Sequence, residues 1–121
     1  MSSVFKRNLR IFKAGADLSS SQYLFVKHDS VANQVVLAGA ADAVGVLQNA
    51  PQLGEPAEVA MLGAGALLKV VGTTAAGDLL KSDAASKGEV TAVDGDNVFA
   101  RALAAGAAND VIEVERVDRQ V

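Results

Sequence analysis

Short apolar runs separated by turn-forming residues dominate the chain after its first twenty or so positions. Most of these runs are rich in Val and are bounded by Gly, Asp, Asn or Pro, which is typical of β-strands. The pattern predicts strands at 23–27, 34–37, 44–47, 58–62, 66–71, 89–93, 98–103 and 111–117.

The last run shows the clearest alternation. Ile112 and Val114 alternate with Glu113 and Glu115, so one face of this strand is expected in the core and the other in water. Two Ala-rich stretches, 40–43 and 102–108, favour helix by propensity. They are short and lie close to Gly residues, so we expect only short helical turns there.

The two halves of the chain resemble each other. A shift of 55 positions aligns Glu58-Val59 with Glu113-Val114, and a shift of 54 aligns 25–29 with 79–83. We therefore expect Glu58 and Glu113 to occupy equivalent places in two related halves. The predicted fold is mainly β: a small antiparallel β-barrel or sandwich with possible internal duplication, short helical turns and an extended N-terminal arm.

The domain prediction separates an arm at 1–15 from a single β domain at 16–121, with pseudo-repeats at about 16–62 and 70–117. Residues 1–13 carry a charge of +4, which leaves −7 on the rest of a chain whose net charge is −3. Apolar side chains lie between these cations. The residues predicted to bind a partner are Val4, Phe5, Lys6, Arg7, Leu9, Arg10, Ile11, Phe12 and Lys13.

Three interpretations of the arm remain open. It forms the first strand of the domain's own sheet, it docks on a neighbouring subunit or partner, or it binds nucleic acid. The third is the weakest, because four cations without a second basic patch make a poor footprint for phosphates. We expect residues 1–13 to leave their own barrel and to lie on another subunit.

Composition excludes several protein classes. With 23 Ala, 17 Val and five aromatic residues, the core is built from small and β-branched side chains, unlike a Leu-rich helical bundle. The absence of Cys excludes a disulfide framework and a thiolate metal site. The uncharged central stretch 59–68 is ten residues, and no uncharged stretch is longer than twelve, whereas a membrane span needs about twenty. We therefore expect a soluble chain with no membrane partner.

No catalytic, cofactor-binding or metal-binding residues are predicted, and the chain is not expected to be an enzyme. Residues 94–97, Asp-Gly-Asp-Asn, lack the further acidic ligands of a calcium loop and fit a tight hairpin turn. His28 is the only imidazole and has no Cys or second His with which to share a metal. Glu113 and Glu115 are expected on a solvated strand face.

One stretch has a competing interpretation. Residues 77–83, followed by 89–93, resemble the turn and strand of lipoyl and biotinyl carrier domains, which are themselves small duplicated β-barrels. In those domains the modified lysine follows the acidic residue at a hairpin tip. Here Ala84 follows Asp83, while Lys81 precedes it and Lys87 lies four residues beyond it. A carrier domain is the alternative function.

Five segments are informative when taken together: 4–18, 22–27, 45–51, 54–60 and 76–83. With these segments the chain resembles the capsid cement, or head decoration, proteins of tailed bacteriophages. The resemblance implies a mainly β homotrimer on the exterior of the virion capsid, made in the cytoplasm of the bacterial host. Its implied partner is the major capsid protein, whose neighbouring subunits it clamps together, with no direct contact to nucleic acid.

Overall fold

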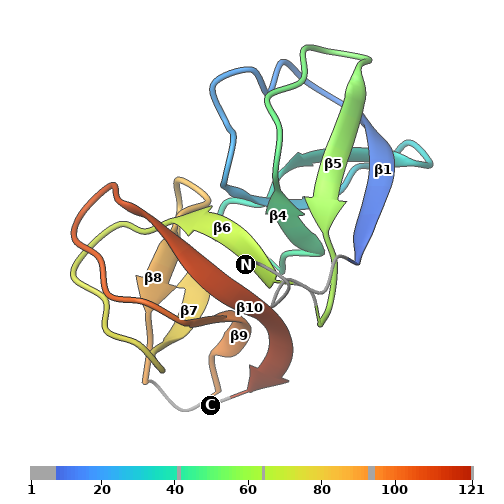
Figure 1. Ribbon diagram of the computed structural model, residues 1–121. Helices are drawn as coiled ribbons and strands as arrows, with labels where there is room; N and C mark the ends of the chain where they lie inside the picture. The colour runs from blue at the N-terminus through green and yellow to red at the C-terminus, as the bar shows by residue number, and fades with distance from the viewer. Residues whose placement is uncertain (1–7, 41, 64, 93–94, 121) are drawn as a thin grey trace.

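The computed structural model describes residues 8–40, 42–63, 65–92 and 95–120. These residues form ten β-strands and no helix, so the prediction of a mainly β fold is confirmed. The strands gather in two lobes (Figure 1). Their bounds are β1 Leu9–Ala14, β2 Phe25–His28, β3 Gln34–Leu37, β4 Gly45–Leu47, β5 Pro56–Ala60, β6 Gly65–Lys69, β7 Leu79–Ser82, β8 Gly88–Val90, β9 Asn97–Ala102 and β10 Val111–Gln120.

We call residues 9–60 the first unit and residues 65–120 the second unit. The first unit is a closed barrel with the strand order β1-β3-β2-β4-β5, in which β1 pairs with β5 antiparallel and with β3 parallel. The second unit is a five-stranded sheet with the order β6-β10-β9-β7-β8. A parallel bridge between Val70 and Gly88 links the two ends of this sheet.

Both units have the same strand pairing. Replacing β1 to β5 by β6 to β10 in order reproduces every neighbour relation, including the parallel contact between the first and third strands. The register also agrees, because Gln48 N–H, just after β4, donates to the Glu58 carbonyl at 2.8 Å, and Leu103 N–H, just after β9, donates to the Glu113 carbonyl at 2.9 Å. Glu58 and Glu113 therefore hold equivalent places, as the offset of 55 residues predicts.

The loops repeat their backbone hydrogen bonds as well. Tyr23 N–H donates to the Leu47 carbonyl at 2.7 Å, and Gly77 N–H donates to the Ala102 carbonyl at 2.7 Å. Tyr23 and Gly77 also share a left-handed backbone, with φ of 70° and 92°. The same conformation is thus imposed on a tyrosine in one unit and on a glycine in the other, which favours tertiary context over local propensity as its cause.

Two hydrophobic clusters make up the core. One lies inside the first unit and is formed by Phe12, Ala14, Leu18, Val26, Val35, Leu47, Ala57 and Val59. The other spans both units and includes Phe25, whose ring meets the Phe99 ring edge-on with 6.1 Å between their centroids. Burial of apolar surface is the main stabilising term in folding, so this shared cluster holds the units together as one body.

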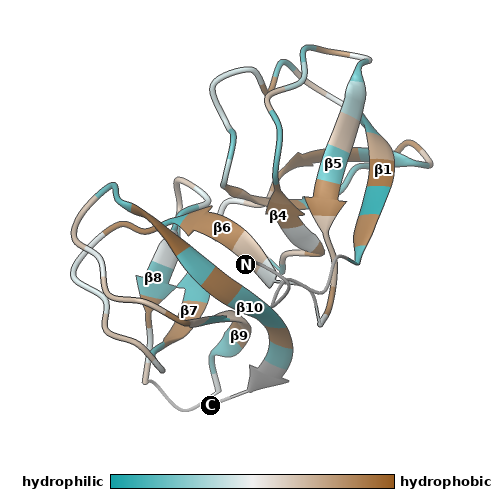
Figure 2. Cartoon of the chain, viewed as in Figure 1, coloured by the Kyte–Doolittle hydropathy of each residue, from teal (hydrophilic) through white to brown (hydrophobic). Residues whose placement is uncertain are grey.

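The alternation predicted for β10 is present. Ile112 and Val114 are buried, Glu115 is exposed and Glu113 is half-buried. Figure 2 shows this as hydrophilic and hydrophobic bands that alternate along the strand. The solvated face expected for the two glutamates is therefore seen at Glu115 and in part at Glu113.

Three expectations need correction. Residues 9–14 are the barrel strand β1, so they do not leave their own barrel as we expected, and the first unit begins within the segment assigned to the arm at 1–15. The second unit likewise begins at β6, before residue 70.

The expected helical turns are absent from the described residues. At Gly106 a Cβ atom would lie 2.6 Å from Ile112 Cγ2, so close packing against β10 decides the path of that loop.

Candidate partner-binding surface

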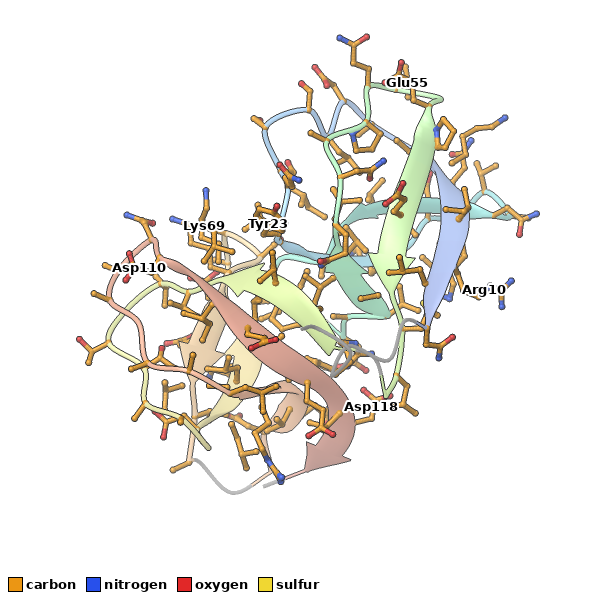
Figure 3. All side chains as sticks on the ribbon, viewed as in Figure 1. Arg10, Tyr23, Glu55, Lys69, Asp110 and Asp118 are labelled. Atoms are coloured by element: carbon orange, nitrogen blue, oxygen red, sulfur yellow. The ribbon has the colours of Figure 1, made fainter. Side chains whose placement is uncertain are left out.

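β1 presents two different faces. Phe12 and Ala14 point into the first unit and are buried, whereas Ile11 and Lys13 point outward. The Ile11 side chain is 61% exposed. Arg10 lies at the end of the barrel with its guanidinium 5.7 Å from the centroid of the Phe12 ring, and it projects away from both lobes in Figure 3. The outward face thus combines one large apolar side chain with Lys13, and Arg10 adds a second exposed cation at the end of the barrel.

The structure divides the nine predicted partner-binding residues into three groups. Four lie outside the described residues: Val4, Phe5, Lys6 and Arg7. Leu9 is half-buried and packs against the shared core, and Phe12 is 8% exposed within the first unit. Burial of Phe12 in its own barrel removes it from contact with a partner. Arg10, Ile11 and Lys13 are exposed and stay candidates for partner binding.

An open groove of about 860 Å³ runs along the junction between the units. His28, at the end of β2, contributes to its wall and meets the Phe12 ring edge-on with 5.6 Å between the ring centroids. His28 is exposed, as expected for a lone surface histidine. The groove wall also contains Lys27, Asp42, Ala43, Val44, Met61, Leu62, Arg116 and Asp118.

Among the buried residues in the described part of the chain, Arg116 is the only one with a charged side chain. It follows Ile112 and Val114 at an inward position of β10, just before a β-bulge. Its Nη2 donates to the Val44 carbonyl of the first unit at 2.9 Å. Its Nη1 donates to the carbonyls of Phe99 and Val117, the latter at 2.8 Å. The side chain therefore joins the two units.

The surroundings of Arg116 explain its electrostatics. Burial lowers the pKa of the guanidinium, and the carboxylate of Asp118, 3.3 Å from Nη1, partly offsets this. Nε has no hydrogen-bond partner among the described residues. A buried cation costs desolvation energy, and the hydrogen bonds to carbonyls of both units offset part of that cost. Arg116 continues the inward alternation of Ile112 and Val114, and this phase is the signal of its burial in the sequence.

The turn between β8 and β9 is held by Asp96. Its Oδ2 accepts a hydrogen bond from Thr91 Oγ1 at 2.5 Å, and it forms an ion pair with Lys81 Nζ at 3.2 Å. The bond from Thr91, followed by the one from Lys81, lowers the pKa of Asp96 below its ordinary 3.8. Gly95 has a φ of +91°, which suits a turn. The hairpin predicted at 94–97 is wrong, because β7 lies between β8 and β9 in the sheet.

The hairpin between β7 and β8 does not present a lysine as carrier domains do. Lys81 lies within β7 and pairs with Asp96, and Lys87 Nζ donates to Asn109 Oδ1 at 2.7 Å beside the start of β8. Ala84 and Ala85 are exposed in the turn. The described residues contain no group of three or more His, Cys, Asp or Glu side chains placed to hold a metal ion.

Comparisons with known proteins identify the fold. No family model and no curated protein matches the chain. A solved structure, the N base of the head fibre gp8.5 in bacteriophage phi29, superimposes with a TM-score of 0.68 at 13% identity. The match covers 93% of this chain and 96% of that one. The chain thus has the fold of this head fibre domain over nearly its full length.

In the part of the chain that the structure describes, no helix is long and apolar enough to cross a membrane.

Proposed function

We propose that the protein is a structural component of a tailed-phage head. In this role it binds the outside of the capsid as a cement protein and stabilises contacts between major capsid subunits. The observation that carries the proposal is the fold, which matches a phage head fibre domain over 93% of the chain. The resemblance of the sequence to head decoration proteins supports it independently.

The two-unit architecture suits a bridging role. A packed genome pushes a shell outward, and a shell yields first at the junctions between subunits. A protein that contacts more than one subunit adds contact area where this strain is greatest. Because Arg116 and the shared core join the units, surfaces on both units keep a fixed spacing.

We further propose that the protein acts as a homotrimer. Three copies of a weak contact reach high avidity, because each bound copy raises the effective concentration of the next. An acidic chain, with a net charge of −3 and cations on β1, would also meet shell loops with a preferred orientation, since charge complementarity governs encounter and register.

The test uses DNA-filled heads purified without the protein. Purified protein should co-sediment with these heads to saturation, in multiples of three copies per binding site by quantitative gel analysis. Coated heads should retain their DNA to a higher temperature than bare heads. A cryo-EM map should place the added density on the outer surface. Absence of co-sedimentation, with the protein folded by circular dichroism, would refute the proposal.

A carrier function predicts a different result. Co-expression with a lipoate ligase or a biotin ligase, followed by intact-mass measurement, should leave the mass unchanged if the structural role holds. Addition of one lipoyl or biotinyl group would instead identify a carrier domain, and Lys81→Ala and Lys87→Ala variants would locate the modified residue.

A further inference from the structure

The backbone of β1 has one paired edge and one open edge. Ala14 N–H donates to the Glu55 carbonyl at 2.9 Å and Met61 N–H donates to the Asn8 carbonyl at 2.9 Å. The backbone N–H and C=O groups of the even-numbered residues of β1 therefore point toward β5. The backbone groups of the odd-numbered residues point to the opposite side, as Lys13 N–H shows by donating to the Asn33 carbonyl at 2.8 Å.

The strand on that opposite side is too short to cover all of β1. β3 begins at Gln34 and pairs only with Lys13 and Ala14. The N–H and C=O groups of Leu9 and Ile11 point to the same side, beyond the start of β3. The register gives them no partner strand among the described residues. An unpaired strand edge of this kind is a template for a further strand.

The equivalent edge in the second unit is covered. Leu67 holds the place of Ile11, since both lie opposite the equivalent glutamates of the last strand. Leu67 N–H donates to Gln48 Oε1 at 3.2 Å, and Gln48 Nε2 donates to the Leu67 carbonyl at 3.1 Å. The side-chain amide of Gln48, in the first unit, therefore forms the same two hydrogen bonds with Leu67 that a backbone peptide group would form.

Two residues further along β6, the same cover continues. Lys69 N–H donates to the carbonyl of Tyr23 in the first unit at 2.8 Å, and both residues lie at the junction in Figure 3. Within one molecule, then, this edge is already a docking site for amide groups of a neighbouring unit. The open edge of β1 has the same backbone N–H and C=O groups, but no neighbouring unit covers them among the described residues.

The side chains around the open edge define the chemistry of its occupant. Ile11 is 61% exposed and calls for an apolar contact. Arg10 and Lys13 are exposed on either side of it, and Glu58 is the exposed anion across from it on β5. Cations thus outnumber anions along this edge of the strand, which favours an acidic segment.

We propose that an extended segment of a capsid shell subunit docks on the open edge of β1 at Leu9 and Ile11. The segment adds a strand by backbone hydrogen bonds, covers Ile11 with an apolar side chain, and places acidic side chains beside Arg10 and Lys13. This inference rests on the proposed function, because it requires the chain to bind heads.

Hydrogen exchange on heads tests the inference directly. Purified protein is bound to DNA-filled heads that lack it, and exchange is followed by mass spectrometry in overlapping peptides across 8–15. The amides of Leu9 and Ile11 should exchange at least about tenfold more slowly on heads than in the free protein, because pairing protects them. Binding to heads without this protection would overturn the inference and leave the proposed function standing, whereas no binding would overturn both.

Two variants test the same edge. Ile11→Pro removes the outward N–H, and proline is tolerated on a strand edge that faces solvent. It should weaken binding to heads at least about tenfold relative to Ile11→Ala, with both variants compared by thermal melting. Lys13→Glu keeps the backbone intact and should weaken binding more than Lys87→Glu, a charge reversal in the second unit. Equal affinities within either pair of folded variants would overturn the inference.

Discussion

The edges of β1 and β6 occupy the same place in two units of the same topology, yet only the edge of β6 is covered within the molecule. The cover comes from two residues of the first unit, the Gln48 side chain on Leu67 and the Tyr23 carbonyl on Lys69. At the position after β9 that is equivalent to Gln48, the residue is Leu103, whose exposed side chain has no amide. Two units of the same topology thus have similar edges, and contacts from the first unit make only the β6 edge an internal joint.

A second difference concerns close packing between strands. The register aligns Gly45 of β4 with Ala100 of β9. A Cβ at Gly45 would lie 2.4 Å from the Ala60 carbonyl oxygen, while Ala100 is fully buried with its methyl group in place. The first unit is thus tighter at this crossing, and the two units are similar in topology without being interchangeable in packing.

The largest expected effect breaks the joint between the units. Arg116→Ala removes the bonds to Val44, Phe99 and Val117 and empties a buried site, so it should lower the free energy of unfolding by about 3–5 kcal/mol. Arg101→Ala, at a half-exposed position on the neighbouring strand, is the control and should cost less than about 1 kcal/mol. Urea unfolding measures both, and similar losses would show that Arg116 is not the link between the units.

The glycine comparison comes next. Gly45→Ala should destabilise the protein by about 1–3 kcal/mol, because the new methyl group meets backbone and the side chain of Val59. The reciprocal change, Ala100→Gly, should cost only about 1 kcal/mol, through added backbone freedom and a lost methyl group. Thermal and urea unfolding compare them. A neutral Gly45→Ala would mean that β4 and β5 move apart at little cost.

Gln48→Leu makes the two positions after β4 and β9 alike and should cost about 1–2 kcal/mol, since Leu67 loses both bonds to the amide. Hydrogen exchange should show faster exchange at the Leu67 amide. Gln34→Leu, at a half-buried position of β3, serves as the control and should leave this amide unchanged. If the Leu67 amide exchanges equally slowly in the unchanged protein and in both variants, the Gln48 side chain does not protect it from exchange.

The smallest effect is a dependence on acid. Hydrogen bonds lower the pKa of Asp96, from Thr91 first, and of Asp17, from Ser19. The native state thus favours both carboxylates in the charged form, and their contribution is present above the ordinary pKa of 3.8 and is lost as pH falls through the lowered values. Asp96→Asn should therefore flatten the fall of the melting temperature below that pH. An unchanged acid profile would contradict this assignment.

Local patterns alone located most strands of this protein. The alternation of Ile112 and Val114 with glutamates gave β10 its inward and outward faces, because a half-buried strand must alternate. The offset of 55 residues gave Glu58 and Glu113 their equivalence, because similar sequences pair in a similar register. Turn-forming residues at 94–97 marked the end of one strand and the start of β9, although β7 separates β8 from β9 in the sheet and the two form no hairpin. Each of these features depends on residues close together in the chain.

Tertiary structure decided what depends on distant residues. Residues 9–14 have the cations of an exposed arm, and only the presence of β5, more than forty positions away, makes them a barrel strand. Arg116 is buried because carbonyls from both units converge on it, and the amide of Gln48 reaches β6 only after the units have packed. Such partners are set by pairing across the fold, where no local periodicity records them.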